Sequence, residues 1–477
     1  MLLISNGTLI SSSGLRRADI LVDGERIAAV EPAITPADIP SLLTTLQSPL
    51  SNPQSPTPNL QLFDASGLLI FPGLIDVHTH MREPGGEQKE DFYTGTCAAL
   101  AGGVTTIFAM PNTSPAVVDR PTFERALDLA QRKAACDFGL FLGATNTNQR
   151  VKEQDPGLGE CGLKMYMGSS TGDLLVQDFG PQYEHFLHYP RQRVIAVHTE
   201  HEPAVQYFAQ RGSRRPPICA ELETSRAITL AQRCGRPVHI CHMSTLREVE
   251  LVRDAKTRGV QVTCEFAPHH LFLKDEGRRM KDEGGSELPS SFILHPSAFQ
   301  MNPPLREHAD VDALWANLDL ADCIATDHAP HTLEEKNGPQ PPSGVPGLEA
   351  MLPLLLTAAL ADAVQTRQAI DTLGSHSVAV PLHLPDIARL CCEGPARVYN
   401  IARKGRIAPG FDADLTLVDP DEEWIIGDKP LFTKCGWSPF AGWRVQGAVR
   451  RTYVRGRLAF SDGAIVARPG SGRRVEN

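Results

Sequence analysis

Apolar and polar positions follow two different patterns along the chain, and the change of pattern divides it into regions. Near the N-terminus, LLISNGTLI and ADILVDGERIAAVEP alternate apolar and polar residues as half-buried strands do, and DGER supplies a hairpin turn. Residues 37–62 are rich in Pro, Ser and Asn, which predicts a flexible surface insertion. Alternating runs return after residue 404, in GRIAPGFDADLTLVDPDEEW and VQGAVRRTYVRGRLAFSDGAIV.

Between these regions the chain carries eight nearly continuous apolar runs of about strand length. They are LLIFPGLIDVHTH, VTTIFAMPN, FGLFLGATN, CGLKMYM, RVIAVHTE, RPVHICHM, VQVTCEFAPHH and DCIATDHAPH. Segments with helical periodicity and glycine stops separate them, such as EDFYTGTCAALAGG and TLREVELVRDAKTRG. Apolar strands that alternate with helices indicate a parallel sheet covered on both faces, and eight such units predict a closed (β/α)₈ barrel.

The predicted fold class is therefore α/β, a TIM barrel with a second, smaller domain. The 477 residues exceed the size at which single cores stop growing, so a second domain is expected. We predict the barrel over residues 67–404. We expect residues 1–66 and 405–477 to pair into a small discontinuous β-sandwich domain, because both segments have the alternating pattern.

Composition narrows the possible partners and the compartment. A formal net charge of −10 argues against nucleic acid or an anionic membrane as the main partner. The eleven cysteines show no CxxC spacing, which indicates free thiols in a reducing compartment. The N-terminus lacks the basic region of a signal peptide, and the longest uncharged stretch, residues 39–62, is too rich in Pro, Ser and Asn to cross a membrane. The simplest expectation is a cytoplasmic protein.

Polar residues end nearly every apolar run, at the face where barrel enzymes build their active sites. They are His78, His80, Asn112, Asn146, Lys164, His198, His242, Glu265, Asp327 and His331. Since strand side chains alternate, His78, His80 and Arg82 are expected to share one face. An HxH pair alone is weak evidence for a metal, but histidines and an aspartate at the ends of three later strands strengthen it. The pattern predicts a metal centre.

The chemistry of such a centre depends on how the ligands divide. His78, His80 and Asp327 are expected to hold one ion, and His198 and His242 a second. Lys164 has two interpretations: an ordinary lysine that reaches solvent or an acid, or a neutral amine that takes up carbon dioxide and bridges both ions as a carbamate. Imidazole and carboxylate ligands suit zinc, although manganese, iron and cobalt fit the same shell. Asp327 is placed to serve as general base and then general acid.

These residues lie in motifs that resemble the amidohydrolase superfamily and, within it, the dihydroorotases. DVHTHMREPGGEQKEDF resembles the first dihydroorotase signature and ATDHAPHTLEEK the second, while MPNT and APHH fall where that family has them. The resemblance covers nearly the whole chain and is close to the dihydroorotase domain of the multifunctional animal pyrimidine-synthesis protein. It rests further on LFLGA, HICH, TCEFAPHHLFL, DALW and PGLEAMLPLLLTA.

The resemblance implies the reversible conversion of N-carbamoyl-L-aspartate to L-dihydroorotate and water, in pyrimidine biosynthesis. It places two Zn²⁺ ions on His78, His80, Lys164 as N6-carboxylysine, His198, His242 and Asp327. It assigns the substrate carboxylate to Arg82, Asn112 and His331, further substrate contacts to Asn302, Ser343 and Gly344, and a mobile lid to Ser170 and Thr171. It also implies a homodimer and an association with aspartate transcarbamoylase.

The sequence departs from the family at three places and leaves rivals open. Thr79 replaces an apolar residue, GSSTGD matches the animal-type lid poorly, and the insertion at residues 37–62 is unlike compact members. Another cyclic amidase, such as a hydantoinase, dihydropyrimidinase or allantoinase, would share the metals but needs no carboxylate clamp, and a non-catalytic scaffold that binds aspartate transcarbamoylase would have lost ligands. Cys241 and Glu265 could hold an extra ion, although a buried thiol is simpler for Cys241. His239, His269 and His270 are expected to be structural.

Overall fold

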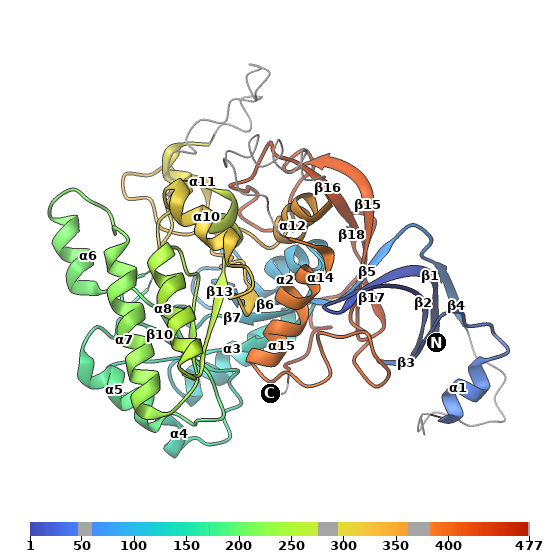
Figure 1. Cartoon of the computed structure of the whole chain (residues 1–477), viewed down its shortest axis with the longest axis horizontal. Coiled ribbons are helices and arrows are strands. Elements are labelled where there is room, and N and C mark those ends of the chain that lie inside the picture. Colours follow the sequence, from blue (N-terminus) through green and yellow to red (C-terminus); the bar gives the residue numbers. More distant parts are fainter. Residues whose placement is uncertain (46–59, 171, 275–293, 361–381, 476–477) are drawn as a thin grey trace.

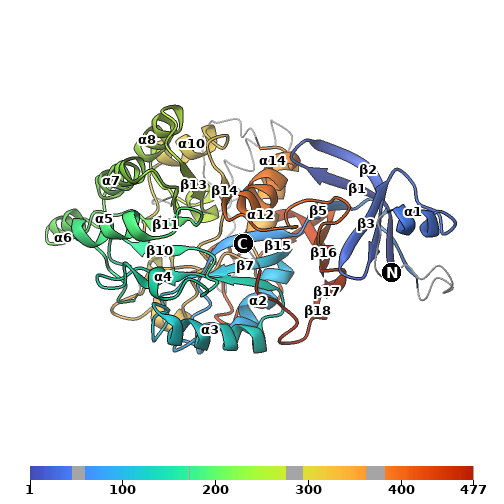
Figure 2. The ribbon, with the colours of Figure 1, turned by 90° about the horizontal axis from the view of Figure 1, so that it is seen from below.

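The computed structural model of the chain describes residues 1–45, 60–170, 172–274, 294–360 and 382–475. It consists of a barrel of parallel strands wrapped by helices, and a curved, mostly antiparallel sheet beside it (Figure 1). Seen from below, the sheet lies at one end of the molecule and the helices α5–α8 lie at the other (Figure 2). Among the described residues, no helix has the length and apolar character needed to cross a membrane.

Eight parallel strands close the barrel, as predicted. They are β6 (Leu74–Thr79), β7 (Val104–Ala109), β8 (Asp137–Leu140) with its short continuation β9 (Leu142–Gly143), β10 (Leu163–Tyr166), β11 (Ile195–His198), β12 (Val238–Ile240), β13 (Val262–Phe266) and β14 (Cys323–Ile324). Neighbours pair in chain order, and β8 meets β10 through the Cys161 N–H, which donates to the Leu140 carbonyl. The ring closes where the His80 N–H donates to the His328 carbonyl at 2.7 Å.

Helices follow most of these strands and cover the outside of the barrel. The α-helices are α2 (Phe92–Ala101), α3 (Arg120–Lys133), α4 (Val151–Gln154), α5 (Phe179–His188), α6 (Glu202–Ala209), α7 (Ile218–Cys234), α8 (Leu246–Thr257), α9 (Pro268–Phe272), α10 (His308–Ala316), α11 (Leu333–Lys336), α12 (Met351–Leu360), α14 (Leu384–Ala388) and α15 (Gly394–Val398). A 3₁₀ turn, η2 (Pro296–Phe299), and a π-helical turn, η3 (Arg389–Glu393), complete them. Capping boxes at Asp91, Asp119 and Thr245 satisfy the first N–H groups of α2, α3 and α8, so these helices begin where the sequence changes from loop to helical periodicity.

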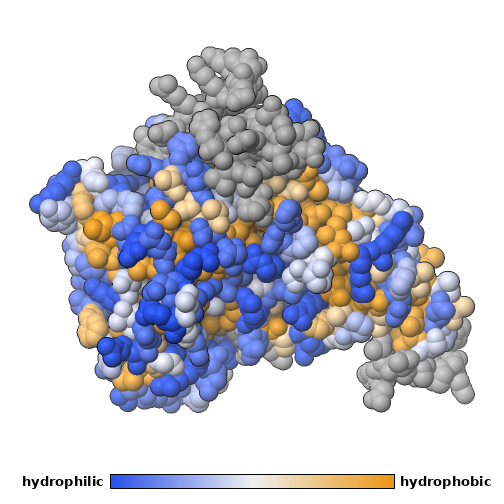
Figure 3. Space-filling view, in the orientation of Figure 1, coloured by the Kyte–Doolittle hydropathy of each residue, from blue (hydrophilic) through white to orange (hydrophobic). Residues whose placement is uncertain are grey.

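Strands from both ends of the chain form one nine-stranded sheet, which confirms that the two alternating regions pair. Its order is β18 (Ala464–Ile465), β17 (Arg457–Ser461), β16 (Arg444–Val454), β15 (Leu415–Ile425), β5 (Leu69–Pro72), β1 (Leu2–Ser11), β2 (Gly14–Asp23) and β3 (Arg26–Glu31), with β4 (Gln61–Asp64) beside β1. The joint is β15, which runs antiparallel to β5. One apolar core is continuous from the barrel into this sheet, and apolar residues are visible where the two meet (Figure 3).

The first predicted run, LLIFPGLIDVHTH, is two strands rather than one. Its first part is β5 of the sheet and its second part is β6 of the barrel, and Gly73 separates them. A Cβ on Gly73 would lie 2.2 Å from Thr105 Oγ1, so only glycine fits where the chain passes from one sheet to the other. The period of the apolar residues cannot reveal this break, because both strands are fully buried.

The predicted flexible insertion is partly structured. Residues 39–45 form the helix α1 (Ile39–Thr45), and β4 begins at Gln61. The Ile39 side chain is fully buried beside Leu3 and Leu21, so apolar contact holds a helix in a segment whose composition favours a loop. The rest of the insertion, residues 46–59, lies outside the described residues.

A buried network of charges joins the barrel to the sheet. The Lys404 ammonium contacts the carboxylates of Asp137 in β8, at 2.8 Å, and of Asp414, which precedes β15. Arg455 pairs with Asp137 as well. The side chains of Lys404, Asp137 and Asp414 are each at most 4% exposed, so water stabilises neither the ammonium nor the two carboxylates.

We expect Lys404→Met to lower the free energy of unfolding by about 3–5 kcal/mol, because it removes a partner of two buried carboxylates. The measurement is urea unfolding of purified wild type and variant. As a control, Lys256→Met removes a partly exposed lysine that pairs with Asp322 at 2.6 Å and should cost much less. Equal losses for the two variants would show that the buried network does not stabilise the junction.

Candidate active site

The polar residues at the carboxyl ends of the strands converge as predicted, with one exception. His78 lies in β6 and His80 directly after it, while Lys164 and His198 lie in β10 and β11. His242 and Asp327 follow β12 and β14 within three residues. The exception is Asn146, whose side-chain amide donates to the Leu175 carbonyl at 3.2 Å and takes no part in the cluster.

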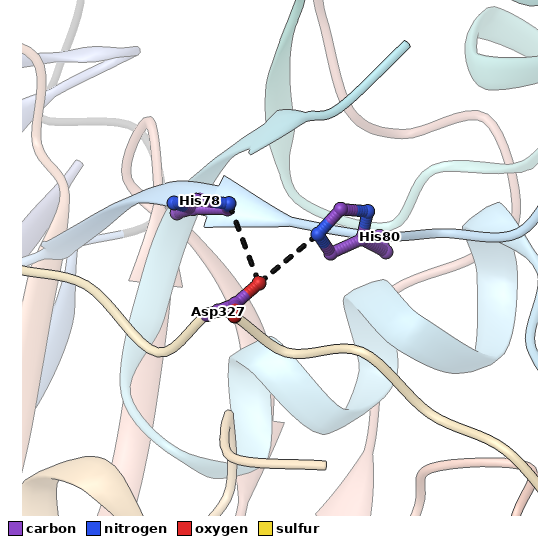
Figure 4. A group of neighbouring side chains, drawn as sticks. All are labelled: His78, His80 and Asp327. Atoms are coloured by element: carbon purple, nitrogen blue, oxygen red, sulfur yellow. Dashed lines mark hydrogen bonds and ion pairs between the residues drawn. The ribbon is translucent and has the colours of Figure 1, made fainter. Parts of the chain in front are cut away.

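His78, His80 and Asp327 form the first half of the cluster (Figure 4). The Oδ1 atom of Asp327 lies 3.0 Å from His80 Nε2 and 3.3 Å from His78 Nε2. The opposite ring nitrogens have other partners: His80 Nδ1 lies 2.7 Å from Asn112 Oδ1, and His78 Nδ1 contacts Glu265 Oε1. Each imidazole is therefore held between an oxygen on one side and Asp327 on the other.

The hydrogen-bond roles in this half fit a cation. Asn112 Oδ1 and the Glu265 carboxylate can only accept, so the Nδ1 atoms of His78 and His80 carry protons. Burial lowers the pKa of His80 to about 4, so near neutral pH its Nε2 atom has a lone pair rather than a proton. The Nε2 atoms of His78 and His80 and a carboxylate oxygen of Asp327 face one another, and a divalent cation is the partner that such a set of donors suits.

The carboxylate of Asp327 stays ionised in this environment. Burial alone would raise the pKa of Asp327, but the positive charge and hydrogen bond that His78 and His80 supply when they are protonated outweigh burial and lower the pKa of Asp327 below its usual value. An anion that is permanently present near neutral pH can bind a cation or accept a proton.

His198 and His242 form the second half of the cluster. His198 Nδ1 lies 3.0 Å from His242 Nε2, and the two rings are 4.9 Å apart. His198 Nε2 lies 3.0 Å from Glu200 Oε2, which accepts its proton and leaves the Nδ1 lone pair directed at His242. The His242 ring is also 5.2 Å from that of His78, so the two halves adjoin.

Lys164 lies beside the two halves, fully buried. Its Nζ atom is 3.0 Å from Cys241 Sγ and 5.1 Å from the centre of the Tyr166 ring. Potential ligand atoms of Cys241, His78 and Glu265 lie within 4.8 Å of one another. No side chain of the described region pairs with Lys164 as a carboxylate would, so the interpretation as an ordinary salt-bridged lysine is not supported.

Arg82, His242 and Asp327 have left-handed backbone conformations, with φ of 58°, 34° and 47°. Residues with side chains rarely adopt these angles, and such strain collects at functional sites, where it aims a side chain. For Arg82 it also means that strand geometry ends before this residue. The alternation that led us to group Arg82 with His78 and His80 therefore does not extend to it.

Arg82 nevertheless points back into the site, toward His331. Its Nε atom donates to the Pro330 carbonyl at 3.0 Å, and Nη2 lies 3.1 Å from His331 Nε2. Burial lowers the pKa of Arg82 to about 10, so the guanidinium is charged near neutral pH. His331 is neutral, since burial and then Arg82 lower its pKa far below the usual value.

The tautomer of His331 follows from its other contacts. The Lys89 ammonium can only donate, and it lies 3.3 Å from His331 Nδ1, which therefore accepts. The proton is then on Nε2, which donates to the Ser343 carbonyl at 3.0 Å. Arg82 Nη2 faces this N–H and cannot donate to it, so the terminal nitrogens of Arg82 have no acceptor among the described residues. Such a guanidinium is suited to an incoming anion.

The remaining predicted substrate residues, Asn302, Ser343 and Gly344, lie on the side of the site that contains His331. Arg214 Nη2 is 3.1 Å from Asn302 Oδ1 and 2.9 Å from Ser343 Oγ, so it joins the two. Gly344 has φ of 131°, and a Cβ there would lie 2.5 Å from the Ala329 carbonyl oxygen and 3.3 Å from His331 Cδ2. Glycine at this position lets the backbone approach His331.

Of the two predicted lid residues, Ser170 is described and Thr171 lies outside the described residues. The segment starts next to Ser169, whose N–H donates to Glu202 Oε2 at 2.6 Å. On the far side, a Cβ on Gly172 would lie 3.4 Å from Asn112 Cβ. Ser170 is thus in a segment that adjoins a predicted substrate residue, and its function as a lid stays a prediction.

The structure adds partners that the sequence analysis did not assign. Glu265 contacts His78 on one oxygen and His239 on the other, at 3.0 Å, and Glu200 contacts both His198 and Arg215. A signal existed for Glu200, since it is two residues after His198. The structural interpretation of His239 and His270 agrees with their contacts, because His270 Nε2 lies 3.1 Å from the Pro303 carbonyl oxygen.

Similarity to known proteins shows the family to which this chain belongs. The family model described as dihydro-orotase-like matches residues 67–149, and the model of the amidohydrolase family matches residues 301–459. A dihydroorotase from Pyrococcus furiosus is 34% identical over 86% of this chain and 86% of its own length. The chain belongs to the dihydroorotase family.

Other dihydroorotase relatives agree, although some are far longer. A dihydroorotase from Staphylococcus aureus is 32% identical over 96% of this chain and 99% of its own. The multifunctional protein CAD of Squalus acanthias is 42% identical over 86% of this chain, which covers only 16% of that protein. The chain thus spans about a sixth of the multifunctional relatives it matches.

Solved structures support the fold of this dihydroorotase family member. L-hydantoinase (dihydropyrimidinase) from Arthrobacter aurescens superposes over 100% of this chain and 99% of its own, with a TM-score of 0.81 and 25% identity. The family and this structural neighbour identify the chain as a metal-dependent cyclic amidohydrolase.

Proposed function

We propose that this protein is a dihydroorotase, which closes N-carbamoyl-L-aspartate to L-dihydroorotate and water in pyrimidine biosynthesis and catalyses the reverse reaction. The observation that carries the proposal is Arg82, a buried guanidinium whose terminal nitrogens have no acceptor among the described residues, at the edge of a histidine and aspartate cluster. Family membership supports it. A carboxylate on the ring substrate is the feature that distinguishes dihydroorotate from the uncharged rings of related amidases.

Two divalent cations are the cofactors we propose, with zinc as the metal. His78, His80 and Asp327 would hold one, and His198 and His242 the other. Lys164 is buried and has no carboxylate partner among the described residues, which favours its carbamate, N6-carboxylysine, as a group that would serve both ions. Such ions supply a water that loses its proton near neutral pH and polarise an amide carbonyl.

Asp327 would move the proton in the reaction. In the direction of ring opening, its carboxylate takes a proton from the attacking water and gives it to the amide nitrogen that leaves the carbonyl carbon. It can accept a proton near neutral pH because its pKa lies below the usual value and the carboxylate is therefore ionised. In ring closure the same carboxylate takes the proton from the ureido nitrogen.

We propose that the residues around Arg82 and His331 bind the substrate. Arg82 would bind the substrate carboxylate, assisted by Asn112 and His331, while Asn302, Ser343 and Gly344 would contact the ring. Ser170 and Thr171 would belong to a lid. The guanidinium compensates locally for the overall charge of −10, which would otherwise repel a dianionic substrate. A cytoplasmic location, a homodimer and an association with aspartate transcarbamoylase stay predictions.

The test is a comparison of ring opening for three substrates. We expect turnover of L-dihydroorotate, followed in the ultraviolet at alkaline pH, and no turnover of dihydrouracil or allantoin, because the uncharged rings cannot use Arg82. About two zinc ions per chain should be counted, and removal of metal with a chelator should abolish turnover until zinc is restored. Turnover of dihydrouracil or allantoin instead would favour another cyclic amidase, and bound metal without any turnover would favour the scaffold.

A further inference from the structure

Lys336, the last residue of α11, has an unusual set of partners. Its side chain is fully buried. The ammonium donates to three backbone carbonyls, those of Gln300 at 2.8 Å, Pro342 at 2.9 Å and Gly344 at 3.0 Å. An ammonium has three protons, so these bonds use all of them.

The three carbonyls belong to two chain segments that form one edge of the candidate substrate pocket. Residues 300–302 end with Asn302, and residues 341–344 contain Ser343 and Gly344. Gln300 adds to the junction, because its carbonyl accepts from the Gly344 N–H at 2.9 Å and its amide donates to the Pro341 carbonyl at 2.7 Å. Lys336 is at the centre of this junction.

A lysine with only carbonyl partners is costly to bury. Among the described residues no carboxylate pairs with Lys336, whereas the buried Lys152 pairs with Glu160 at 2.8 Å and Lys404 pairs with Asp137 and Asp414. Burial, followed by the nearby Arg214 and Arg82, lowers the pKa of Lys336 to about 7. A neutral side chain would fill the same space without this desolvation cost, so stability alone does not explain the lysine.

We propose that Lys336 is a positioning residue of the substrate pocket: it ties residues 300–302 to residues 342–344 and so fixes the edge of the pocket beside His331 and Arg82. The geometry continues into the site, because the Ser343 carbonyl in the tied segment accepts from His331, which adjoins Arg82. The catalytic consequence of this inference rests on the proposed function, while the tying itself does not.

The test compares Lys336→Met with Lys152→Met, a matched buried lysine that bonds a carbonyl and a carboxylate at another place. Two quantities are measured: backbone amide exchange by mass spectrometry in residues 295–302 and 337–344, and kcat and KM for L-dihydroorotate in the zinc-loaded enzyme. For Lys336→Met we expect faster exchange in both segments and KM raised by about tenfold, with kcat within about threefold and metal content unchanged. Lys152→Met should change neither segment nor KM.

If Lys336 had a purely structural role, Lys336→Met would reduce the folded fraction of the protein, and so the apparent kcat, without a change in KM. Unchanged amide exchange in both segments would overturn the proposal. If Lys336→Met does not fold, Gln300→Ala removes the amide bond to Pro341 from the same junction and should raise exchange in residues 337–344 and KM by about threefold. An unchanged KM for Gln300→Ala would also contradict the proposal. If wild type fails to turn over L-dihydroorotate, the proposed function is wrong, and exchange still decides whether Lys336 ties the two segments.

Discussion

Asp327→Asn is expected to lower kcat for L-dihydroorotate by at least about 10³-fold. The amide keeps the shape of the carboxylate but cannot take up a proton, and it removes the anion that His78 and His80 now face at 3.3 and 3.0 Å. Steady-state kinetics with metal counted per chain measures the effect.

A control on the same strand is available for Asp327. Asp322 lies at the other end of β14 and pairs with Lys256 at 2.6 Å, so Asp322→Asn should leave kcat within about twofold. Retention of more than a tenth of wild-type turnover by Asp327→Asn would contradict the proposed proton transfer. Loss of turnover with metal retained would separate the proton-transfer role from metal binding.

Arg82→Lys is expected to lower kcat/KM for L-dihydroorotate by roughly 10²-fold, mostly through KM, with metal content near wild type. A lysine keeps the charge but cannot offer two parallel N–H groups to one carboxylate, and charge-assisted bonds of this kind contribute about 1.5–3 kcal/mol. The left-handed backbone of Arg82 places its guanidinium toward His331 rather than toward the ligands, so no metal loss is expected.

Arg236→Lys is the matched control for Arg82→Lys. Arg236 is also buried, and its guanidinium donates to the carbonyls of Tyr189 and Arg193, so the change should reduce stability and leave KM unchanged. If Arg82→Lys lost metal, Arg82 would have a structural role in the centre that our proposal does not include.

Much of the barrel could be predicted from the sequence because its strands are buried on both faces and end in polar residues. The eight apolar runs contain β6–β14, and most of the polar residues that end these runs converge. The break at Gly73 could not be predicted, because the residues before and after it have the same apolar character and only the close approach of Thr105 requires glycine. The helix α1 was missed for a related reason: the buried position of Ile39 depends on contacts distant in sequence.

In the site, too, relations between residues close in sequence could be predicted, whereas contacts between residues distant in sequence could not. The HxH spacing predicts that His78 and His80 lie together, because both share one short segment, and in the structure both face Asp327. Alternation grouped Arg82 with them, but its positive φ shows that another backbone conformation aims it. The contact of Glu265 with His78 joins residues 187 apart, and Lys336 joins segments across a loop, so neither relation is visible in the spacing of the sequence.

The pairing of β5 with β15 has a consequence for synthesis on the ribosome. About 340 residues separate the two strands, which at roughly 5–20 residues per second corresponds to about 17–70 s of translation. During that interval the N-terminal strands exist with the edge of β5 unpaired, and unpaired edges recruit other chains. A nascent chain of this protein therefore has a defined period of exposure to aggregation, which ends only when residues 415–425 leave the ribosome and pair with β5.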